Sequence, residues 1–295
     1  MSKINSESYQ KQLSLYSSII KLRPANSHKG DFGHLLCKGG STGMSGAIAL
    51  CAKAGLRTGC GLVTIDTEKK LIPLIAPYIP EAMFKPNNID RKIDAMVIGP
   101  GKNNGYPKFH ENQFKKTNLK EITNNEDHNF YPILLDAGAV QLLDEKEAGL
   151  WKRFYHPLII TPHPGEIAKL TNQPIPRTKK ERFRIASKVA QKFNITVVLK
   201  GHQTIIVDPS GNYIENLTGN SGLATAGSGD VLAGIIGSLL AQKYDPFKAA
   251  CLGVGIHGYA SDILIQKGSE EALIASDIIE KIPYVFHKLH NLKKI

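Results

Sequence analysis

Cysteines are few in this chain of 295 residues, and none of the four forms a C-x-x-C pair; they are Cys37, Cys51, Cys60 and Cys251. A structural zinc site and a disulfide framework both need closer, recurring spacings, so neither is predicted. No apolar run approaches the ~18 residues that a membrane-spanning helix requires. The N-terminal segment also lacks the hydrophobic stretch of a secretory signal. We therefore expect a protein of the reducing cytoplasm.

Acidic residues are in the minority: 26 Asp and Glu stand against 37 Lys and Arg, for a formal net charge of +11. Such a charge can attract nucleic acid, an anionic membrane or a phosphorylated small molecule. The basic residues cluster at 177–184 and 287–295, without an aromatic-interleaved RNA motif or a DNA-binding module. A solvated helix face and tail explain the clusters better. We expect neither a nucleic-acid nor a membrane partner.

Short apolar runs alternate with helical patterns through most of the sequence, and several runs are apolar at successive positions, as strands covered on both faces must be. The predicted strands are His34–Lys38, Leu62–Asp66, Asp94–Ile98, Pro132–Asp136, Leu158–Thr161 and Ile195–Lys200. Strands that alternate with helices pair in parallel through right-handed crossovers. The fold class predicted is therefore α/β, a three-layer αβα arrangement with a mostly parallel central sheet.

After residue 200 the regular alternation of strands and helices ends. Residues 203–208 and 213–217, joined by a turn, read as a hairpin. Helices are predicted over Arg177–Phe193, Asp230–Gln242, Pro246–Gln266 and Ser276–Leu289. We find no repeat and no linker, and predict residues 1–27 as a helical extension and 28–295 as a single domain. The polar segment Lys102–Phe130 is expected to be a surface loop with a short helix.

The most informative stretch is NSGLATAGSGDVLAGIIGSLL at 220–240. Gly227, Ser228 and Gly229 precede an apolar helix, where free N–H groups point toward anions and glycines let a ligand approach closely. We interpret these three residues as an anion hole for a phosphoryl group. Asp230 stands in the first turn and can accept a proton from an attacking hydroxyl. An Asp that merely caps the helix is the alternative for this stretch alone.

Three other motifs end predicted strands or follow them. LKGHQT carries Lys200, a cation that can meet nucleotide phosphates, and Thr204, a further donor. TPHPGE places His163 in a proline-rigidified turn where open α/β sheets bind ligands. GGSTGMSGA, at 39–47, is a glycine-rich loop before a helix. The literal G-x-G-x-x-G at 253–258 lies inside a helical pattern without a preceding strand, so we reject it as a nucleotide motif.

Together these motifs resemble the ADP- or ATP-dependent NAD(P)H-hydrate dehydratase family, whose members have the ribokinase-like fold. The resemblance rests on HKGDFG, GGSTGMSGA, GLVTI, VIGPG, ITPHPGE, VLKGHQT and TAGSGDVLAG, which occur in that order between His28 and the last helix. It implies repair of NADHX and NADPHX, hydrated cofactors that carry a hydroxyl at C6 of the nicotinamide ring. ADP or ATP would be the co-substrate and Mg²⁺ the cofactor.

The resemblance also implies roles for individual residues. Asp230 would be the catalytic base, and the hydrated dinucleotide would be contacted by Ala47, Gly101, His163 and Asp230. The nucleotide-binding positions would be Lys200, Gly201, His202, Gln203, Thr204 and Gly229. Glu166 matches the position of a carboxylate that, in related kinases, orients Mg²⁺ through water, and no set of metal ligands is predicted. A homotetramer is expected, with the epimerase of the same pathway as a separate protein.

The chain departs from the family pattern at two places. VIGPG is followed by Lys102 and Asn103 where Leu-Gly is usual, and Gly138 replaces the second acid of an Asp-Ala-Asp-Ala-Leu motif that begins at Asp136. The second departure puts substrate contacts near residue 138 in doubt. The main alternative function is a small-molecule kinase of the same fold, of the hydroxyethylthiazole or pyridoxal type. A catalytically silent nucleotide sensor would have no need of Asp230.

Overall fold

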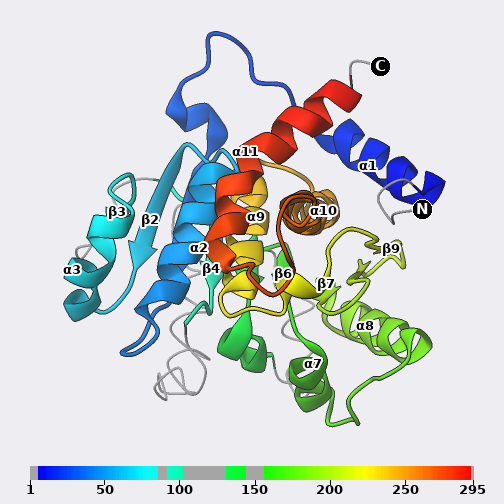
Figure 1. Ribbon diagram of the computed structural model, residues 1–295. Coiled ribbons are helices and arrows are strands. Elements are labelled where there is room, and N and C mark those ends of the chain that lie inside the picture. Colours follow the sequence, from blue (N-terminus) through cyan, green and yellow to red (C-terminus); the bar gives the residue numbers. More distant parts are fainter. Residues whose placement is uncertain (1–5, 86–91, 102–130, 144–155, 294–295) are drawn as a thin grey trace.

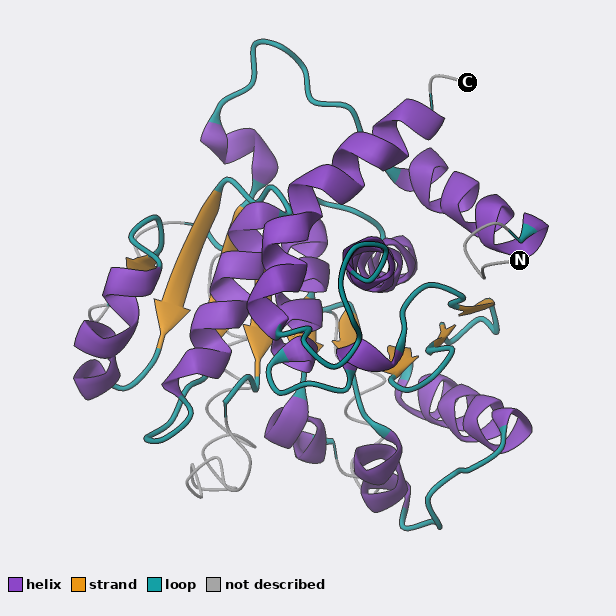
Figure 2. Cartoon of the chain, viewed as in Figure 1, coloured by secondary structure: helices purple, strands orange, loops and turns teal. Residues whose placement is uncertain are grey.

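One sheet runs through the centre of the computed structural model, which describes residues 6–85, 92–101, 131–143 and 156–293 (Figures 1 and 2). Within these residues the strand order is β3-β2-β1-β4-β5-β6-β7-β8-β9. Pairing is parallel from β3 to β7 and antiparallel from β7 to β9. The strands are β1 (His34–Lys38), β2 (Leu62–Asp66), β3 (Met83–Phe84), β4 (Ala95–Ile98), β5 (Ile133–Leu135), β6 (Leu158–Ile160), β7 (Thr196–Leu199), β8 (Ile205–Val207) and β9 (Tyr213–Glu215).

Helices cover both faces of this sheet, as the αβα prediction requires. One face packs against α1 (Glu7–Ile19), α2 (Ser45–Arg57), α9 (Ser228–Ala241), α10 (Pro246–Leu264) and α11 (Ala275–Leu292). The other packs against α7 (Pro164–Thr171), α8 (Lys179–Phe193) and the 3₁₀ helix η6 (Ala137–Leu142). Strand residues alternate between the two cores: Leu35 belongs to the first and Leu36 to the second. The described residues also form the short helices α3 (Ile72–Ile75), η2 (Lys29–Phe32), η3 (Lys69–Leu71), η4 (Ala76–Tyr78) and η8 (Ser221–Leu223).

The predicted elements agree closely with the structure. Strands 34–38 and 62–66 have the predicted bounds, and the other predicted strands, the hairpin included, are shorter than predicted by one to three residues. Helix α9 begins at Ser228 and not at Asp230, so Ser228 and Gly229 lie inside its first turn. The proline-rich turn that was expected to carry Glu166 is instead the start of α7, with Pro164 as its first residue. The segment Lys102–Phe130 lies outside the described residues.

Helix α1 contributes to the main core. Tyr9 and Tyr16 have no exposed surface, and Leu13 is 2% exposed. In Figure 1, α1 lies alongside the C-terminal helix α11, near α10. Helix α1 therefore buries an apolar stripe against the helices that cover this face of the sheet. No described helix is both long and apolar enough to cross a bilayer.

The order in which successive strands are added to the sheet reverses between β1 and β4. From β1 the chain adds β2 and β3 on one side, and it then continues on the other side with β4 and β5. In open parallel sheets the crevice beyond the carboxyl ends of the strands at such a reversal is the preferred ligand position. The loops that follow β1 and β4 are the glycine-rich 39–44 and the Gly99–Gly101 turn, so two of the motifs meet there.

Candidate active site

The loops after β1 and β4 are in direct contact. The Gly40 N–H donates to the Pro100 carbonyl at 2.8 Å, and the Ser41 hydroxyl donates to the Gly101 carbonyl at 2.6 Å. Gly101 has φ +75°, and a Cβ there would lie 2.6 Å from the Met44 carbonyl oxygen. Only glycine fits such a position. The same Cβ would be 3.1 Å from that of Ala47, so the structure brings these two predicted substrate positions together.

A second part of the site is the N-terminus of α9. Gly227, which precedes the helix, has φ +86°, and a Cβ on it would meet Leu50 Cδ1 at 2.5 Å. The first turn of the helix leaves backbone N–H groups without intrahelical acceptors. Of the three predicted anion-hole residues, Ser228 already has an acceptor for its backbone N–H, which donates to the Thr225 carbonyl oxygen at 3.4 Å. Gly227 and Gly229 flank it in the same turn.

His257 of α10 fixes the first turn of α9. Its Nε2 lies 3.0 Å from the Ser228 carbonyl oxygen and 3.1 Å from the Ser228 hydroxyl. Burial lowers the pKa of His257 to about 4, so the ring is neutral at physiological pH and an N–H at Nε2 donates to the carbonyl. The rejected 253–258 pattern is confirmed as part of a buried helix. It nevertheless contains a residue that supports the site.

A cavity of about 520 Å³ opens between this helix turn and the loop after β7. Its wall includes the whole predicted nucleotide loop, from Lys200 to Thr204, together with Gly229. The opposite wall comes from residues 216–225 and from α10. The cavity contains polar loops, a helix N-terminus and one lysine, which suits a phosphorylated ligand.

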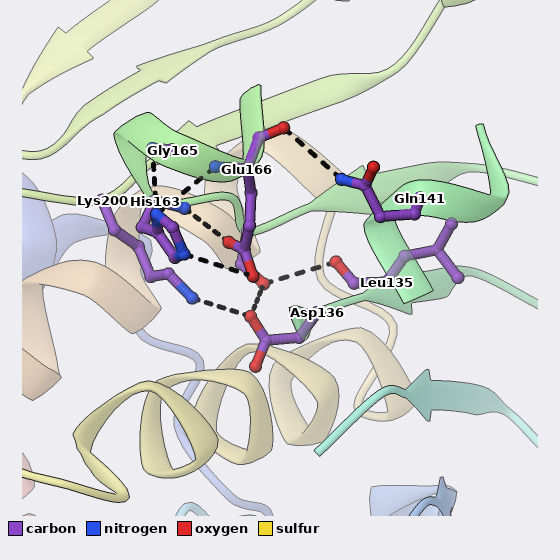
Figure 3. A network of polar contacts seen from close by, with 8 residues as sticks. Leu135, Asp136, Gln141, His163, Gly165, Glu166 and Lys200 are labelled. Atoms are coloured by element: carbon purple, nitrogen blue, oxygen red, sulfur yellow. Dashed lines mark hydrogen bonds and ion pairs between the residues drawn. The ribbon is translucent and has the colours of Figure 1, made fainter. Parts of the chain in front are cut away.

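At the base of the site, Lys200 pairs with a buried carboxylate, as Figure 3 shows. Lys200 Nζ lies 2.8 Å from Asp136 Oδ1, and Asp136 also accepts from the Thr161 hydroxyl at 2.7 Å. Asp136 is 2% exposed, so its charge is compensated almost wholly by these two partners. Desolvation opposes the charged form of Lys200, but the neighbouring carboxylates, with Asp136 foremost, leave its pKa raised. Lysine is therefore a fixed cation here.

Asp230 lies close enough to this pair to be affected by it. Burial, together with the charge of Asp136, raises the pKa of Asp230 to about 7, although Lys200 acts in the opposite direction. A Cβ on Gly229 would be 3.4 Å from Lys200 Nζ, so the lysine reaches the same helix turn that carries Asp230. A carboxylate with a pKa near 7 can accept and return a proton at physiological pH.

His163 and Glu166 form the N-terminal cap of α7, the third element at this edge of the sheet. The imidazole Nδ1 accepts from the Gly165 N–H at 2.9 Å, while the Glu166 carboxylate accepts from the His163 N–H at 2.7 Å. An accepting Nδ1 places the ring proton of neutral His163 on Nε2. The ring is exposed, and its Nε2 lies 3.7 Å from Glu166 Oε1. Beside it, a hollow of about 380 Å³ is lined by Gly138 and Glu166.

Whether the site could bind a metal depends on the ligating side chains that it offers. Among the described residues no group of three or more His, Cys, Asp or Glu side chains is arranged to hold an ion. Mg²⁺ commonly binds through one or two carboxylates and the phosphates of a substrate, so a protein-only cage is not required. The residues therefore fit a metal that arrives with a nucleotide, with Glu166 as a carboxylate near Lys200 and outside the ion pair.

Three residues of this site were not among the predicted ones. Asp136 was noted only as the start of an altered motif, yet its carboxylate pairs with Lys200 across 64 sequence positions. His257 belonged to a motif that we rejected. Arg182 lay in the basic cluster interpreted as a solvated helix face, and that interpretation is wrong for this residue because its guanidinium is half-buried against the loop after β7. Long-range partners of this kind leave no local signal.

Comparisons with known proteins agree with this geometry. Residues 35–284 match the family model described as NAD(P)H-hydrate dehydratase. The chain is 38% identical to an ADP-dependent (S)-NAD(P)H-hydrate dehydratase of Neisseria meningitidis, over 89% of this chain and 88% of that protein. A Bacillus subtilis protein of the same name is 33% identical, over 90% and 93% of the two chains.

Solved structures extend the comparison to three dimensions. The ADP/ATP-dependent NAD(P)H-hydrate dehydratase of Bacillus subtilis, co-crystallised with ATP and Mg²⁺, superposes with a TM-score of 0.79 and 30% identity, over 94% of this chain and 97% of that one. A hydroxyethylthiazole kinase from Pyrococcus horikoshii has a TM-score of 0.57 at 15% identity and covers 96% of this chain and 94% of its own, which shows a shared fold alone. The chain spans about half of a bifunctional NAD(P)H-hydrate repair enzyme from Escherichia coli, at 35% identity, covering 92% of this chain and 52% of that protein.

Proposed function

The chain belongs to the NAD(P)H-hydrate dehydratase family, which has the ribokinase-like fold, and from that premise we propose that it repairs hydrated NADH and NADPH. It acts on the S form of NADHX or NADPHX and uses ADP or ATP, releasing AMP or ADP with phosphate. The observation that carries the proposal is Asp230, which stands in the first turn of α9 with a pKa raised to about 7, beside the fixed cation Lys200.

The first chemical step is phosphoryl transfer. The oxygen of the C6 hydroxyl attacks the terminal phosphorus, the bond from that phosphorus to the leaving AMP or ADP breaks, and Asp230 accepts the hydroxyl proton. The N-terminus of α9 and the Lys200 ammonium stabilise the negative charge of the transferred group. A loose transition state requires mainly positioning, which the turn at Gly227 and the His257 contact provide.

The second step is elimination. The C6–O bond breaks, phosphate leaves, and the lone pair of the ring nitrogen supplies electrons while a proton is lost from C5. Phosphorylation makes this possible because phosphate is a far better leaving group than hydroxide. The crevice at Ala47 and Gly101 holds the dinucleotide, and His163 donates to it from Nε2.

The nucleotide occupies the cavity of about 520 Å³, with its phosphates against Lys200 and the loop to Thr204. Mg²⁺, when bound, neutralises phosphate charge. Most of its ligands would be nucleotide oxygens, and the Glu166 carboxylate would contact its water shell.

We further propose a homotetramer and a cytoplasmic location. All four cysteines are buried and free, which suits a reducing compartment. A separate epimerase would supply the S form from the R form. These features rest on the family resemblance and on the cysteines, and gel filtration with light scattering would test the tetramer.

The decisive experiment is incubation with NADHX and either ADP or ATP, followed by the absorbance of NADH and by inorganic phosphate release. Repair gives equal amounts of NADH, phosphate and AMP or ADP. A kinase of the hydroxyethylthiazole or pyridoxal type would instead convert its vitamin precursor to a stable phosphate ester and leave NADHX unchanged. That second result would overturn the proposal.

A further inference from the structure

Arg182 of α8 holds three carbonyl groups, two in the loop that joins β7 to β8 and one on Leu199, the last residue of β7. Its Nη1 donates to the His202 carbonyl oxygen at 2.6 Å, and its Nη2 donates to that of Leu199 at 3.3 Å. The third and longest contact, at 3.5 Å, joins Nη2 to the Gln203 carbonyl oxygen. Burial lowers the pKa of Arg182, yet arginine stays charged because its ordinary pKa lies so far above neutrality. The guanidinium therefore uses both terminal nitrogens to hold the loop that joins β7 to β8.

These contacts determine which way the loop's peptide groups point. In a trans peptide the carbonyl of one residue and the N–H of the next point in opposite directions, so the His202 and Gln203 carbonyls turned toward Arg182 direct the N–H groups of Gln203 and Thr204 away from α8. In the part of the chain that the structure describes, neither of these N–H groups donates to a backbone carbonyl, and both residues line the cavity. Two N–H donors beside Lys200 form a ready site for phosphate oxygens.

The loop needs such support because its backbone is in an unfavourable conformation. Gln203 has φ +54° and Gly201 has φ +138°. A left-handed conformation is unfavourable for a non-glycine residue such as Gln203, so a free loop would relax from it. Arg182 Nη2 lies 3.1 Å from the position that a Cβ on Gly201 would take, which shows how closely the guanidinium follows the turn.

We propose that Arg182 is a positioning residue for nucleotide binding, which rests on the proposed use of ADP or ATP. It does not touch the nucleotide; it turns the His202 and Gln203 carbonyl groups away so that the N–H groups of Gln203 and Thr204 face the phosphates. The planar guanidinium reaches separate carbonyl groups with two nitrogens at once. A lysine at position 182 would keep the charge but would lose this geometry.

The alternative is that Arg182 only joins α8 to the β7–β8 hairpin and contributes to stability. Arg182→Lys separates the two roles, with Arg184→Lys as the matched control, because Arg184 lies on the same helix and its side chain is exposed. For each variant we would measure KM and kcat in NADHX repair, ADP affinity by calorimetry without NADHX, and Tm.

We expect Arg182→Lys to raise both KM for ADP and the dissociation constant of ADP by about tenfold, the effect of losing a charge-assisted hydrogen bond. The kcat at saturating ADP should remain close to that of the wild type, and Arg184→Lys should match the wild type throughout. A lower Tm with unchanged KM and affinity would overturn the proposal and leave Arg182 a structural contact.

Hydrogen exchange on the wild-type protein provides a test that needs no variant. ADP should slow exchange of the Gln203 and Thr204 amides, and unchanged exchange in saturating ADP would overturn the proposal. A wild type that binds ADP but does not repair NADHX would overturn the proposed function alone, because the affinity measurements still decide the role of Arg182. A wild type that binds neither ADP nor ATP would overturn both.

Discussion

The Lys200 ammonium and the Asp136 carboxylate form a buried ion pair, with Nζ 2.8 Å from Oδ1, next to the helix turn that carries Asp230. The pair links the ends of β5 and β7, two strands that are separated in the sheet by β6. It therefore connects the proposed nucleotide loop with the residue whose charge raises the pKa of the proposed base.

Replacing Lys200 with Ala should weaken ADP and ATP binding, because the cation beside the phosphates is lost. It should also destabilise the fold by about 3–5 kcal/mol, since Asp136 would remain as an unpaired buried charge. The Asp136→Asn, Lys200→Ala double variant removes both charges and should recover much of the stability without the affinity. Chemical denaturation and calorimetry measure the two effects, and a double variant with wild-type affinity would exclude Lys200 from the nucleotide site.

Asp230→Asn should reduce turnover by at least about 10²-fold while ADP still binds, because a positioned base is lost and Asp230 is not among the residues that line the nucleotide cavity. The check is kcat for NADHX repair beside ADP affinity by calorimetry. Asp277, in the first turn of α11, offers a matched Asp→Asn control on another helix. Near-normal activity of Asp230→Asn would remove Asp230 from the role of base.

The pH dependence of kcat/KM should show a limb that rises through about pH 7, because Asp230 must be deprotonated to accept the hydroxyl proton. The Asp136→Asn variant should move this limb to lower pH, since the charge of Asp136 helps to raise the pKa of Asp230. A limb at the same pH in wild type and Asp136→Asn would contradict the coupling.

The raised pKa of Asp230 also makes stability depend on pH, and stability falls over the pH range in which activity rises. A folded-state pKa near 7, raised from 3.8, means that the native protein binds a proton more tightly than the unfolded chain does. The stabilisation from Asp230 is complete below pH 3.8 and falls as the pH rises toward 7. The Tm advantage of Asp230→Asn over the wild type should therefore grow between these pH values, which thermal scans can follow. A Tm difference that stays constant over this range would contradict the raised pKa.

Much of the fold could be predicted because its signals are local. Continuous apolar runs such as 95–98 and 158–160 mark strands that are buried on both faces, and β4 and β6 occupy these residues. The two-residue strand β3 and the early start of α9 were not predicted. A pair of residues has no periodicity, and Gly-Ser-Gly has low helix propensity until the turn at Gly227 and the His257 contact fix it.

The candidate site could be predicted only in part. Motifs located the loops because glycines and prolines restrict the backbone locally, as Gly101 and Pro164 show. The partners of those loops come from distant segments. Asp136 meets Lys200, and Arg182 reaches the carbonyl of His202, through pairing that the sheet and α8 determine. A sequence pattern cannot report contacts that depend on which strands are neighbours.

Gly227→Ala should disturb the site more than the addition of one methyl group suggests. Gly211→Ala provides the matched control. The two glycines have similar φ angles, +86° and +91°, so an alanine at either position has the same left-handed cost of about 1 kcal/mol. They differ in their surroundings: a Cβ at 227 would lie 2.5 Å from Leu50 and 3.1 Å from Ala275, while a Cβ at 211 would meet nothing within 4 Å.

Relief of that clash must move either the Leu50 side chain or the start of α9. Because transfer depends on position, we expect a fall in kcat of about 10²-fold for Gly227→Ala and none for Gly211→Ala, with a larger loss of Tm at 227. Equal losses of Tm and normal kcat in both variants would mean that Leu50 yields and α9 stays in place. The geometry of the first turn would then tolerate a side chain at Gly227, and the anion hole would not depend on glycine there.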